Sequence, residues 1–460
     1  MLISDELPFI RDYVSAINAE LKRANPEKAL SRLQGYWLSF VILGLLVTNS
    51  LCWQRFERFG IGKKSTAGLS WMFRKAVIAE MLLHASVLLI VSTYKIKSCV
   101  LIIDDTDKER SKSTTEIAKV HKIKDKKTGG YFKGQNIVFL VLVSEELTIP
   151  VGFHFYEPDP KMSAWRKEEL RLRSEGVQKQ DRPKPPEADA NYPDKKTLAL
   201  KLISNFVDLL PEICVRAVDA DAFYCSKDFI AEATRITGQK QMISQIKKTQ
   251  LINVGGKNIA VEKFFENATD TKTEELILRG SKKKVTYCSG RFKVKSHDRK
   301  YFIIALKYGD EKEYRYLIAS DSSWRDVDII KTYALRWLVE VFIQDWKSYE
   351  GWNQLAKQQG VDGSDRGVIL SLLSDHALLL HQDQKVMFEN KQPAATVASL
   401  RAKVIIESLQ AFIAEIVLNK DPKGMFEKYL DKISQLFELR SSIKHLRRAD
   451  MSFCSYNQET

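Results

Sequence analysis

Residues 332–347, TYALRWLVEVFIQDWK, mix bulky apolar side chains with polar and charged ones. On a helix of about 3.6 residues per turn, Tyr333, Arg336, Glu340 and Lys347 fall on one narrow stripe. The opposite face is apolar and carries Leu335, Val339, Phe342 and Trp346. The stretch therefore predicts one helix that docks on a sheet by its apolar face. Taken alone, the polar stripe is equally compatible with a solvated face carrying an Arg336–Glu340 pair worth only tenths of a kcal/mol.

Two apolar, β-branched runs elsewhere in the chain are followed by aspartates. They are residues 98–103 (SCVLII), followed by Asp104 and Asp105, and residues 214–218 (CVRAV), followed by Asp219 and Asp221. This pattern is typical of buried strands that stop at a site. An aspartate at a strand end can also be only a turn former or a cap. With Glu340 on the helix, however, the strand ends supply a set of carboxylates that chemistry could use.

The remaining pattern places these residues in a mixed α/β protein. Residues 1–95 and those beyond 360 have helical periodicity, and a charged stretch at 157–196 predicts a loop or arm. Between the helical regions we expect strands at 136–144, 147–156 and 241–246, helices at 197–210 and from 226, and a β-rich, lysine-rich segment at 251–314. A hairpin followed by alternating strands and helices indicates a mixed sheet rather than a purely doubly wound one.

Composition limits the classes of function. Lys and Arg number 72 against 58 Asp and Glu, a net charge of +14, which suits a partner with dense negative charge. The six cysteines are scattered and form no CxxC pair, so a zinc ribbon or a disulfide framework is not expected and a reducing cytoplasm fits best. The uncharged run at 36–53 is about long enough for a membrane span, but we interpret it as a buried helix and expect no membrane partner.

Three carboxylates gathered at one place would repel one another unless hard cations lay between them. Mg²⁺ takes such oxygen ligands and leaves room for water and a phosphate oxygen. Two ions about 3.5–4 Å apart can activate a water or a 3′-hydroxyl and stabilise the leaving oxygen. The acidic set and the basic composition together predict phosphodiester chemistry on nucleic acid.

The spacing Tyr333-x₂-Arg336-x₃-Glu340-x₆-Lys347 resembles the YREK signature of the DDE transposases of bacterial insertion sequences, in the family conventionally numbered four. The stretches VLIIDDTD and VDADAFYCSKDF are similar to the family's first and second aspartate motifs. The resemblance covers roughly residues 97–350, and the flanks match only in being helical.

The resemblance implies an RNase H-like core with a β-rich insertion between the second aspartate and the glutamate. It implies the following divisions: a helical DNA-binding domain at 1–96, the catalytic core at 97–250 and 314–360, the insertion at 251–313, and a helical region for dimerisation or DNA contact at 361–460. By the same resemblance, the catalytic metal ligands would be Asp104, Asp221 and Glu340, and Tyr333, Arg336 and Lys347 would contact DNA. Asp105 and Asp219 remain the alternatives to Asp104 and Asp221.

The implied activity is that of a transposase in the bacterial cytoplasm. It would cut double-stranded DNA at terminal inverted repeats and join the ends to target DNA through a hairpin intermediate. It would act as a homodimer with two Mg²⁺ ions, for which Mn²⁺ can substitute. Two alternatives stay open: a transposase-derived DNA-binding protein without turnover, and an RNase H-like nuclease or resolvase.

Overall fold

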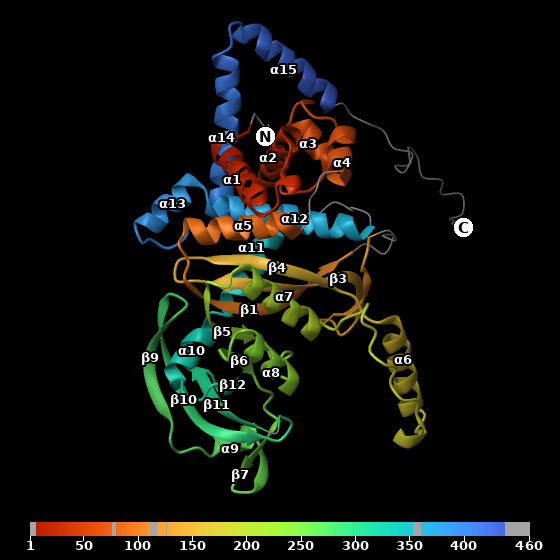
Figure 1. The fold of residues 1–460 in the computed structure, drawn as a ribbon, viewed down its shortest axis with the longest axis vertical. Helices are drawn as coiled ribbons and strands as arrows, with labels where there is room; N and C mark the ends of the chain where they lie inside the picture. Colours follow the sequence, from red (N-terminus) through yellow and green to blue (C-terminus); the bar gives the residue numbers. More distant parts are fainter. Residues whose placement is uncertain are drawn as a thin grey trace, which may run out of the picture.

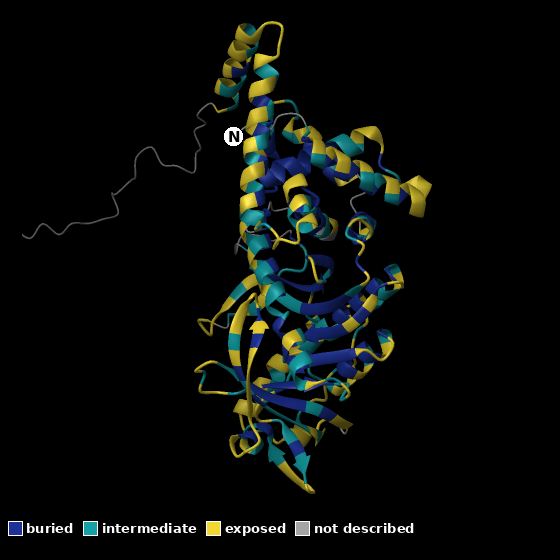
Figure 2. Ribbon diagram, turned by 90° about the vertical axis from the view of Figure 1, so that its left-hand side faces the viewer, coloured by how far each residue is buried: buried dark blue, intermediate teal, exposed yellow. Residues whose placement is uncertain are grey.

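The computed structural model describes residues 6–75, 80–110, 117–125, 127–297, 299–352 and 360–437. One mixed β-sheet runs through the molecule, and a layer of helices covers one end of it (Figure 1). The interior of the sheet and the centre of the helical layer are buried, whereas the outermost helices are largely exposed (Figure 2).

Five strands form the centre of the sheet, in the order β4-β3-β1-β5-β6. β1 pairs antiparallel with β3 and β3 with β4, whereas β5 runs parallel to both β1 and β6. This is the strand arrangement of an RNase H-like core, so the expected mixed α/β fold class is confirmed. The bounds are β1 (Ser98–Glu109), β3 (Tyr131–Val143), β4 (Thr148–Tyr156), β5 (Cys214–Ala220) and β6 (Gln241–Gln245).

The β-rich segment continues this sheet instead of forming a separate one. β12 pairs with β6, and β11 and β10 follow it, so that twelve strands of the described residues make one sheet. The added elements are β7 (Leu251–Val254), β8 (Lys257–Ala260), α9 (Val261–Glu266), β9 (Lys272–Leu278), β10 (Ser281–Val294), β11 (Arg299–Tyr308) and β12 (Arg315–Ala319). At the opposite edge, β2 (His121–Lys124) pairs with β3.

The sequence pattern predicted that β1 stops at its aspartates, but the strand continues beyond them. Its parallel pairing with β5 ends at Ile103 opposite Ala220, but its antiparallel pairing with β3 continues to Glu109. Asp104 is therefore the first residue of β1 without a neighbour on β5. The two strands separate at this point, and the separation exposes an edge at which side chains can gather.

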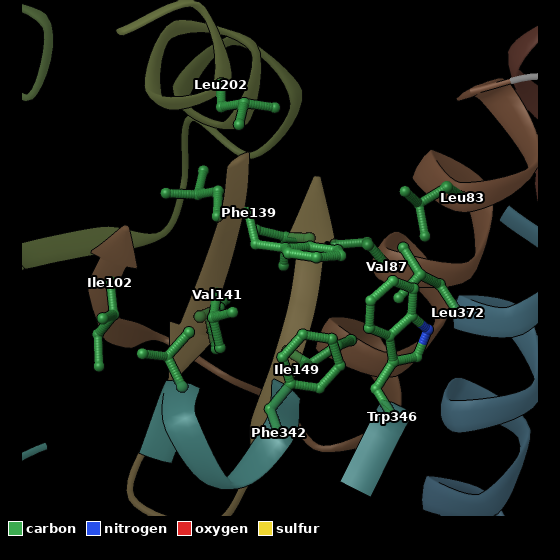
Figure 3. Packing of buried hydrophobic residues seen from close by; sticks show 14 of the residues in the cluster. Leu83, Val87, Ile102, Phe139, Val141, Ile149, Leu202, Phe342, Trp346 and Leu372 are labelled. Atoms are coloured by element: carbon green, nitrogen blue, oxygen red, sulfur yellow. The ribbon is translucent and has the colours of Figure 1, made fainter. Parts of the chain in front are cut away.

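Helices cover both faces of the central strands. On one face, α7 (Lys195–Leu209) packs on β3 and β4 and contacts α8 (Lys227–Ile236). On the other, α10 (Asp326–Ala334) packs on β5 and β6, and α11 (Trp337–Tyr349) on β1 and β4. Figure 3 shows Phe342 and Trp346 of α11 next to Phe139 of β3, with Leu202 of α7 farther along the same core. The predicted apolar face of residues 335–346 thus docks on the sheet.

The helical layer combines both ends of the chain, because α12 packs on α2 and α5, and α14 packs on α2. Its helices are α1 (Pro8–Ala24), the 3₁₀ helix η1 (Pro26–Lys28), α2 (Arg32–Thr48), α3 (Trp53–Phe59), α4 (Thr66–Lys75), α5 (Glu80–Thr93), α12 (Gly360–Leu379), α13 (Gln382–Glu389), α14 (Val397–Val417) and α15 (Pro422–Leu436). The predicted domain boundaries are not tested by this arrangement and remain predictions.

α2 contains most of the uncharged run, and it is a core helix. It begins with a capping box in which the Ser31 side chain accepts from the Gln34 N–H and the Gln34 side chain accepts from the Ser31 N–H. Every residue from Trp37 to Val47 is buried, as we interpreted from the sequence. Across the described residues, no single helix is long and apolar enough to cross a membrane; two bent pairs, α2 with α3 and α4 with α5, reach that length and composition only jointly.

The charged stretch after β4 forms an arm. α6 (Pro160–Ser174) has no buried residue and extends away from the sheet, followed by the 3₁₀ helix η2 (Lys179–Asp181) (Figure 1). Asp159 caps α6 by accepting from the N–H groups of Lys161 and Met162. The proline-containing end of the stretch, residues 182–194, forms a loop as expected, whereas the helix α6 before it was not predicted.

Candidate active site at the edge of the sheet

The predicted helix over residues 332–347 is two helices, and the sequence prediction was wrong in this respect. α10 ends at Ala334 and α11 begins at Trp337. Between them the backbone makes tight i to i+3 hydrogen bonds, from the N–H of Arg336 to the carbonyl of Tyr333 at 3.1 Å and from the N–H of Leu338 to that of Leu335 at 2.8 Å. The turn interrupts the helix between Tyr333 on α10 and the residues Glu340 and Lys347 on α11.

Tyr333 is 7% exposed and packs in the cluster between α10 and the insertion strands, with Ile243 and Ile329 among its members. Burial raises the pKa of its hydroxyl, and the nearby charge of Asp219 raises it further. The structure therefore places Tyr333 beneath the edge of the sheet. A direct contact with DNA would require this side chain to become accessible.

Arg336 joins the first aspartate motif to the glutamate. Its Nη1 donates to Oδ2 of Asp104 at 2.9 Å, and its Nη2 donates to Oε1 of Glu340 one turn further along α11. The Arg336 and Asp104 side chains are 19% and 16% exposed, whereas that of Glu340 is 50% exposed. The two carboxylates lie 236 positions apart in the sequence and are brought to the same cation by the docking of α11 on β1.

Asp104 lies in an environment that disfavours its charge. Burial raises the pKa of its carboxyl to about 6, and the charges of Asp221 and Asp105 act in the same direction. The guanidinium of Arg336 and the N–H of Asp105 oppose this shift. A partly buried carboxylate whose charge is further disfavoured by neighbouring carboxylates is well suited to accept a further cation.

The two candidate aspartates of β1 point to opposite faces of the sheet, as successive strand residues do. Asp104 is paired in register with Phe139, whose ring contacts α11. Asp105 faces α7 instead, where its Oδ2 accepts from Lys195 Nζ at 2.7 Å and from Asn136 Nδ2 at 2.8 Å. Only Asp104 therefore lies on the same side as Glu340.

The roles of Lys195 and Asn136 were not predicted from the sequence. Strand alternation alone would have separated Asp104 from Asp105, but nothing in the sequence pattern indicates which helix supplies the partner of Asp105. Lys195 follows Asp194, which caps α7 by accepting from the N–H of Thr197. The cap fixes the start of the helix and so places the lysine over the back of β1.

β5 brings two aspartates to this edge at different depths. Asp219 is in register with Ile102, so Asp221 follows the strand at the level of Asp104. Asp219 is completely buried, and burial raises the pKa of its carboxyl well above the ordinary value, while the charge of Arg336 opposes this shift. Within the part of the chain that the structure describes, neither side-chain oxygen of Asp219 has a hydrogen-bond partner.

Asp221 is half-buried and lies in the turn after β5. Its Oδ1 accepts from the N–H of Phe223 at 2.8 Å, and Ser244 of β6 donates to its backbone carbonyl at 2.7 Å. These bonds fix the turn and leave the second side-chain oxygen of Asp221 available. The negative charge of Asp221 contributes to the raised pKa of the Asp104 carboxyl.

Lys347 lies at the far end of the same side of α11. Its Nζ donates to Oγ1 of Thr106 at 2.5 Å and to the backbone carbonyl of Asp107 at 3.0 Å. Burial lowers the pKa of this ammonium, and the charge of Asp107 opposes the change. Lys347 thus lies along β1 beyond the carboxylates, with a hydroxyl and a carbonyl as partners.

The donor set suits a hard cation, because it consists of carboxylate oxygens and includes the two unpartnered, buried oxygens of Asp219. Two of the carboxylates, those of Asp104 and Glu340, are already paired with Arg336. Counting only the described residues, no group of three or more His, Cys, Asp or Glu side chains is gathered closely enough to hold a metal ion. The side chains are of the type that binds Mg²⁺, but in the described arrangement they do not form a coordination site.

No protein-family model matches the sequence, and no curated protein matches it. Among solved structures, the chain is similar to piggyBac transposase in a cryo-electron microscopy structure of its synaptic complex with hairpin DNA. The sequence identity is 11% and the TM-score is 0.43, with 95% of this chain and 85% of that chain covered. A similarity of this size assigns no family, so membership of insertion-sequence family four stays a prediction.

Proposed function

We propose that the protein is a DNA transposase that cleaves phosphodiester bonds at transposon ends and transfers the strands to target DNA. The observation that carries this proposal is the meeting of Asp104 and Glu340 at Arg336, at the point where β1 separates from β5. An RNase H-like sheet with carboxylates at this edge, in a chain of net charge +14, suits cleavage of a polyanion.

In this proposal, Asp104, Asp221 and Glu340 hold two Mg²⁺ ions, or Mn²⁺ in their place. The ions would supply activation of the attacking oxygen and stabilisation of the leaving 3′-oxygen. In the first step, water attacks phosphorus and the bond to the 3′-oxygen breaks, which leaves a 3′-hydroxyl. In the later steps, the oxygen of that hydroxyl forms a bond to the phosphorus of another phosphodiester, on the opposite strand or on target DNA. The bond from this phosphorus to its own 3′-oxygen breaks, and the 3′-oxygen leaves as a new 3′-hydroxyl.

The basic residues of α11 have a separate role in the proposal. Arg336 and Lys347 lie on either side of Glu340 along the chain, and both are directed toward β1. A guanidinium recognises a phosphate through two parallel N–H bonds, and an ammonium does so as a point charge. These two side chains would hold the phosphates that flank the bond to be cut. Buried Tyr333 would position Arg336 from below.

The second aspartate is assigned to Asp221 on the basis of depth. Asp221 is level with Asp104 and half-buried, whereas Asp219 lies two residues deeper and is fully buried. Asp219 is then a buried acidic neighbour of Arg336 that does not contact substrate. Either aspartate has the chemistry of a metal ligand, so the assignment requires a direct test.

The test is Mg²⁺-dependent cleavage of DNA that carries the sequences flanking the coding region. We expect cleavage by the wild type, none by Asp221→Asn, and a reduced but measurable rate for Asp219→Asn. DNA binding, followed by gel shift without metal, should persist in both variants. Full cleavage by Asp221→Asn would transfer the ligand role to Asp219, and absence of cleavage by the wild type would contradict the proposed function.

One observation favours a second candidate, a transposase-derived DNA-binding protein without turnover. Across the described ranges, the acidic residues are not gathered into a metal site, and Arg336 neutralises two of them. Such a protein would shift end DNA on a gel without nicking it in Mg²⁺ or Mn²⁺. A nuclease or resolvase would instead cut branched DNA that lacks inverted repeats.

The proposed homodimer has a suitable surface on α14. Ile406, Ile413 and Val417 are 50%, 50% and 63% exposed and follow one another at helical spacing. In Figures 1 and 2, α14 stands out from the helical layer and α15 folds back beside it. We expect a second copy to cover this stripe when two DNA ends are paired. Ile413→Asp should then lower the molar mass of the DNA complex measured by light scattering, without loss of single-end binding.

A further inference from the structure

Arg336 occupies the position between two carboxylates to which the proposed function assigns metal ions. Resting on that function, we infer that Arg336 is a removable counter-ion that blocks metal binding until a DNA phosphate draws its guanidinium away. In this scheme DNA binds first and the divalent cation second. The inference explains why the acidic residues fit a metal in kind but are not gathered around one.

Arg336 is held in this position from several sides. Its two terminal nitrogens each donate to a different carboxylate, one on β1 and one on α11. Burial alone would lower the pKa of the guanidinium, but Tyr333, Asp104, Glu340 and Asp219 together raise it above its ordinary value. Its backbone lies in the tight turn between α10 and α11. The cation is therefore fixed at the carboxylates when nothing else is bound.

A guanidinium and a divalent cation cannot share these oxygens. Both need the lone pairs of Asp104 and Glu340, and two positive groups at such short range would repel each other. Arg336 is only 19% exposed, so little solvent screens it. Metal entry therefore requires that the guanidinium leave, and a metal in bulk solution must compete with two charge-assisted hydrogen bonds.

The open side of the site indicates where the guanidinium goes. Glu340 is 50% exposed and marks the solvent boundary, and Lys347 lies further along the same side of α11. A DNA backbone that lies against Lys347 brings phosphate oxygens to this boundary. A phosphate accepts two parallel hydrogen bonds from a guanidinium, and these bonds replace the ones that Arg336 makes to Asp104 and Glu340. The carboxylates, then without a counter-ion, bind the metal.

The test measures metal binding without DNA, using electron paramagnetic resonance of free Mn²⁺ to follow a titration. The variants are Arg336→Gln and, as a matched control, Arg325→Gln. Arg325 is an exposed arginine just before α10 that pairs with Asp328 at 2.7 Å and is not at the site. We expect Arg336→Gln to bind Mn²⁺ at least about tenfold more tightly than the wild type, and Arg325→Gln to match the wild type.

A second readout covers the case in which Arg336→Gln folds poorly. Its two carboxylates repel without a cation, so Mn²⁺ should raise its Tm, whereas the Tm of the wild type should change little. Arg336→Lys keeps a positive charge, but an ammonium cannot bridge both carboxylates. The Mn²⁺ affinity of this variant should therefore lie between that of the wild type and that of Arg336→Gln. Adding end DNA should tighten Mn²⁺ binding by the wild type.

Equal or weaker Mn²⁺ binding by both Arg336 variants, compared with the wild type, would overturn the inference. If the wild type nevertheless cleaves DNA in Mg²⁺, only the role of Arg336 is wrong. If the wild type does not cleave DNA, the proposed function fails, and this result is read from the cleavage assay alone.

Discussion

A pair of acidic side chains lies near each end of α11, and the two pairs are neutralised differently. At the start of the helix, Asp104 and Glu340 share the Arg336 guanidinium. At its end, Glu350 is completely buried and interacts with Asp375 of α12. Burial raises the pKa of both carboxyl groups at this end, that of Asp375 to about 6, and no described cationic side chain compensates them.

The surroundings account for the difference. Glu350 is completely buried and lies in the sequence between Trp346 and Trp352, whose stacked rings have centroids 4.5 Å apart. A pair of carboxyl groups in such a place keeps a proton, because burial and the repulsion between two neighbouring carboxylates disfavour the ionised forms. At the edge of the sheet the half-exposed Glu340 leaves a path open. The comparison teaches that a carboxylate pair becomes a candidate site when its counter-ion can be exchanged.

The largest predicted effect is on the rate of DNA cleavage, and it distinguishes the aspartates on the two faces of β1. Asp104→Asn should lower the rate of Mg²⁺-dependent DNA cleavage by more than about a hundredfold, since it removes a proposed ligand. Asp105→Asn is the matched control, because that side chain faces Lys195 on the other side. Quantified nicking of end-labelled DNA gives both rates. Equal losses in the two variants would mean that position on the sheet does not decide the role.

The buried pair should determine how stability depends on pH. Because the folded pKa of Asp375 is raised above the unfolded one, the folded state holds the proton more tightly, and stability is lost as pH rises from about 4 to about 6. Asp375→Asn cannot ionise, so its free energy of unfolding in urea should fall less than that of the wild type between pH 4 and 7. Parallel profiles for the two proteins would contradict a shared proton, and Asp12→Asn, at an exposed position of α1, serves as the control.

Replacing Lys347, near the end of α11, should affect DNA binding more than the stability of the fold. Lys347→Ala removes an ammonium close to the proposed phosphate path, and we expect the slope of log affinity against log salt to fall by about one. Lys331→Ala, on the exposed side of α10, should leave the slope unchanged. Fluorescence anisotropy at several salt concentrations measures both. An unchanged slope for Lys347→Ala would restrict this lysine to bracing Thr106.

The smallest predicted effect is that of replacing Lys195, which pairs with Asp105 on the face of β1 that α7 covers. Lys195→Ala breaks a partly exposed ion pair with Asp105, and such pairs contribute about 0–1 kcal/mol to folding. We expect a loss of stability in that range and retention of most cleavage activity. A loss of cleavage as large as that of Asp104→Asn would make the back of β1 part of the active site.

The strands of the core could be predicted from the sequence because their signals are local. The runs at 136–144, 147–156 and 214–218 are apolar and bounded by turn residues, and the structure has strands at all three. The aspartates after two strands and the polar side chains near Glu340 were likewise visible as patterns. Their meeting at Arg336 follows from the docking of the apolar face of α11, which the period of about 3.6 residues also revealed.

Other features depend on tertiary contacts and could not be predicted. The break at Leu335 and Arg336 carries no Gly or Pro, and it coincides with the point where Tyr333 packs into a different cluster from Phe342. β1 continues beyond Asp104 because β3 pairs with it, which is a property of the partner strand. The joining of the insertion to the core sheet depends in the same way on the pairing of β12 with β6.

The central claim is that Glu340 belongs to an exchangeable acidic site that cuts DNA, and the most direct measurement is the cleavage of end DNA by Glu340→Gln in Mg²⁺. The account predicts that this variant binds the DNA with an affinity close to that of the wild type and releases no 3′-hydroxyl end. Cleavage by Glu340→Gln at the rate of the wild type would contradict the account.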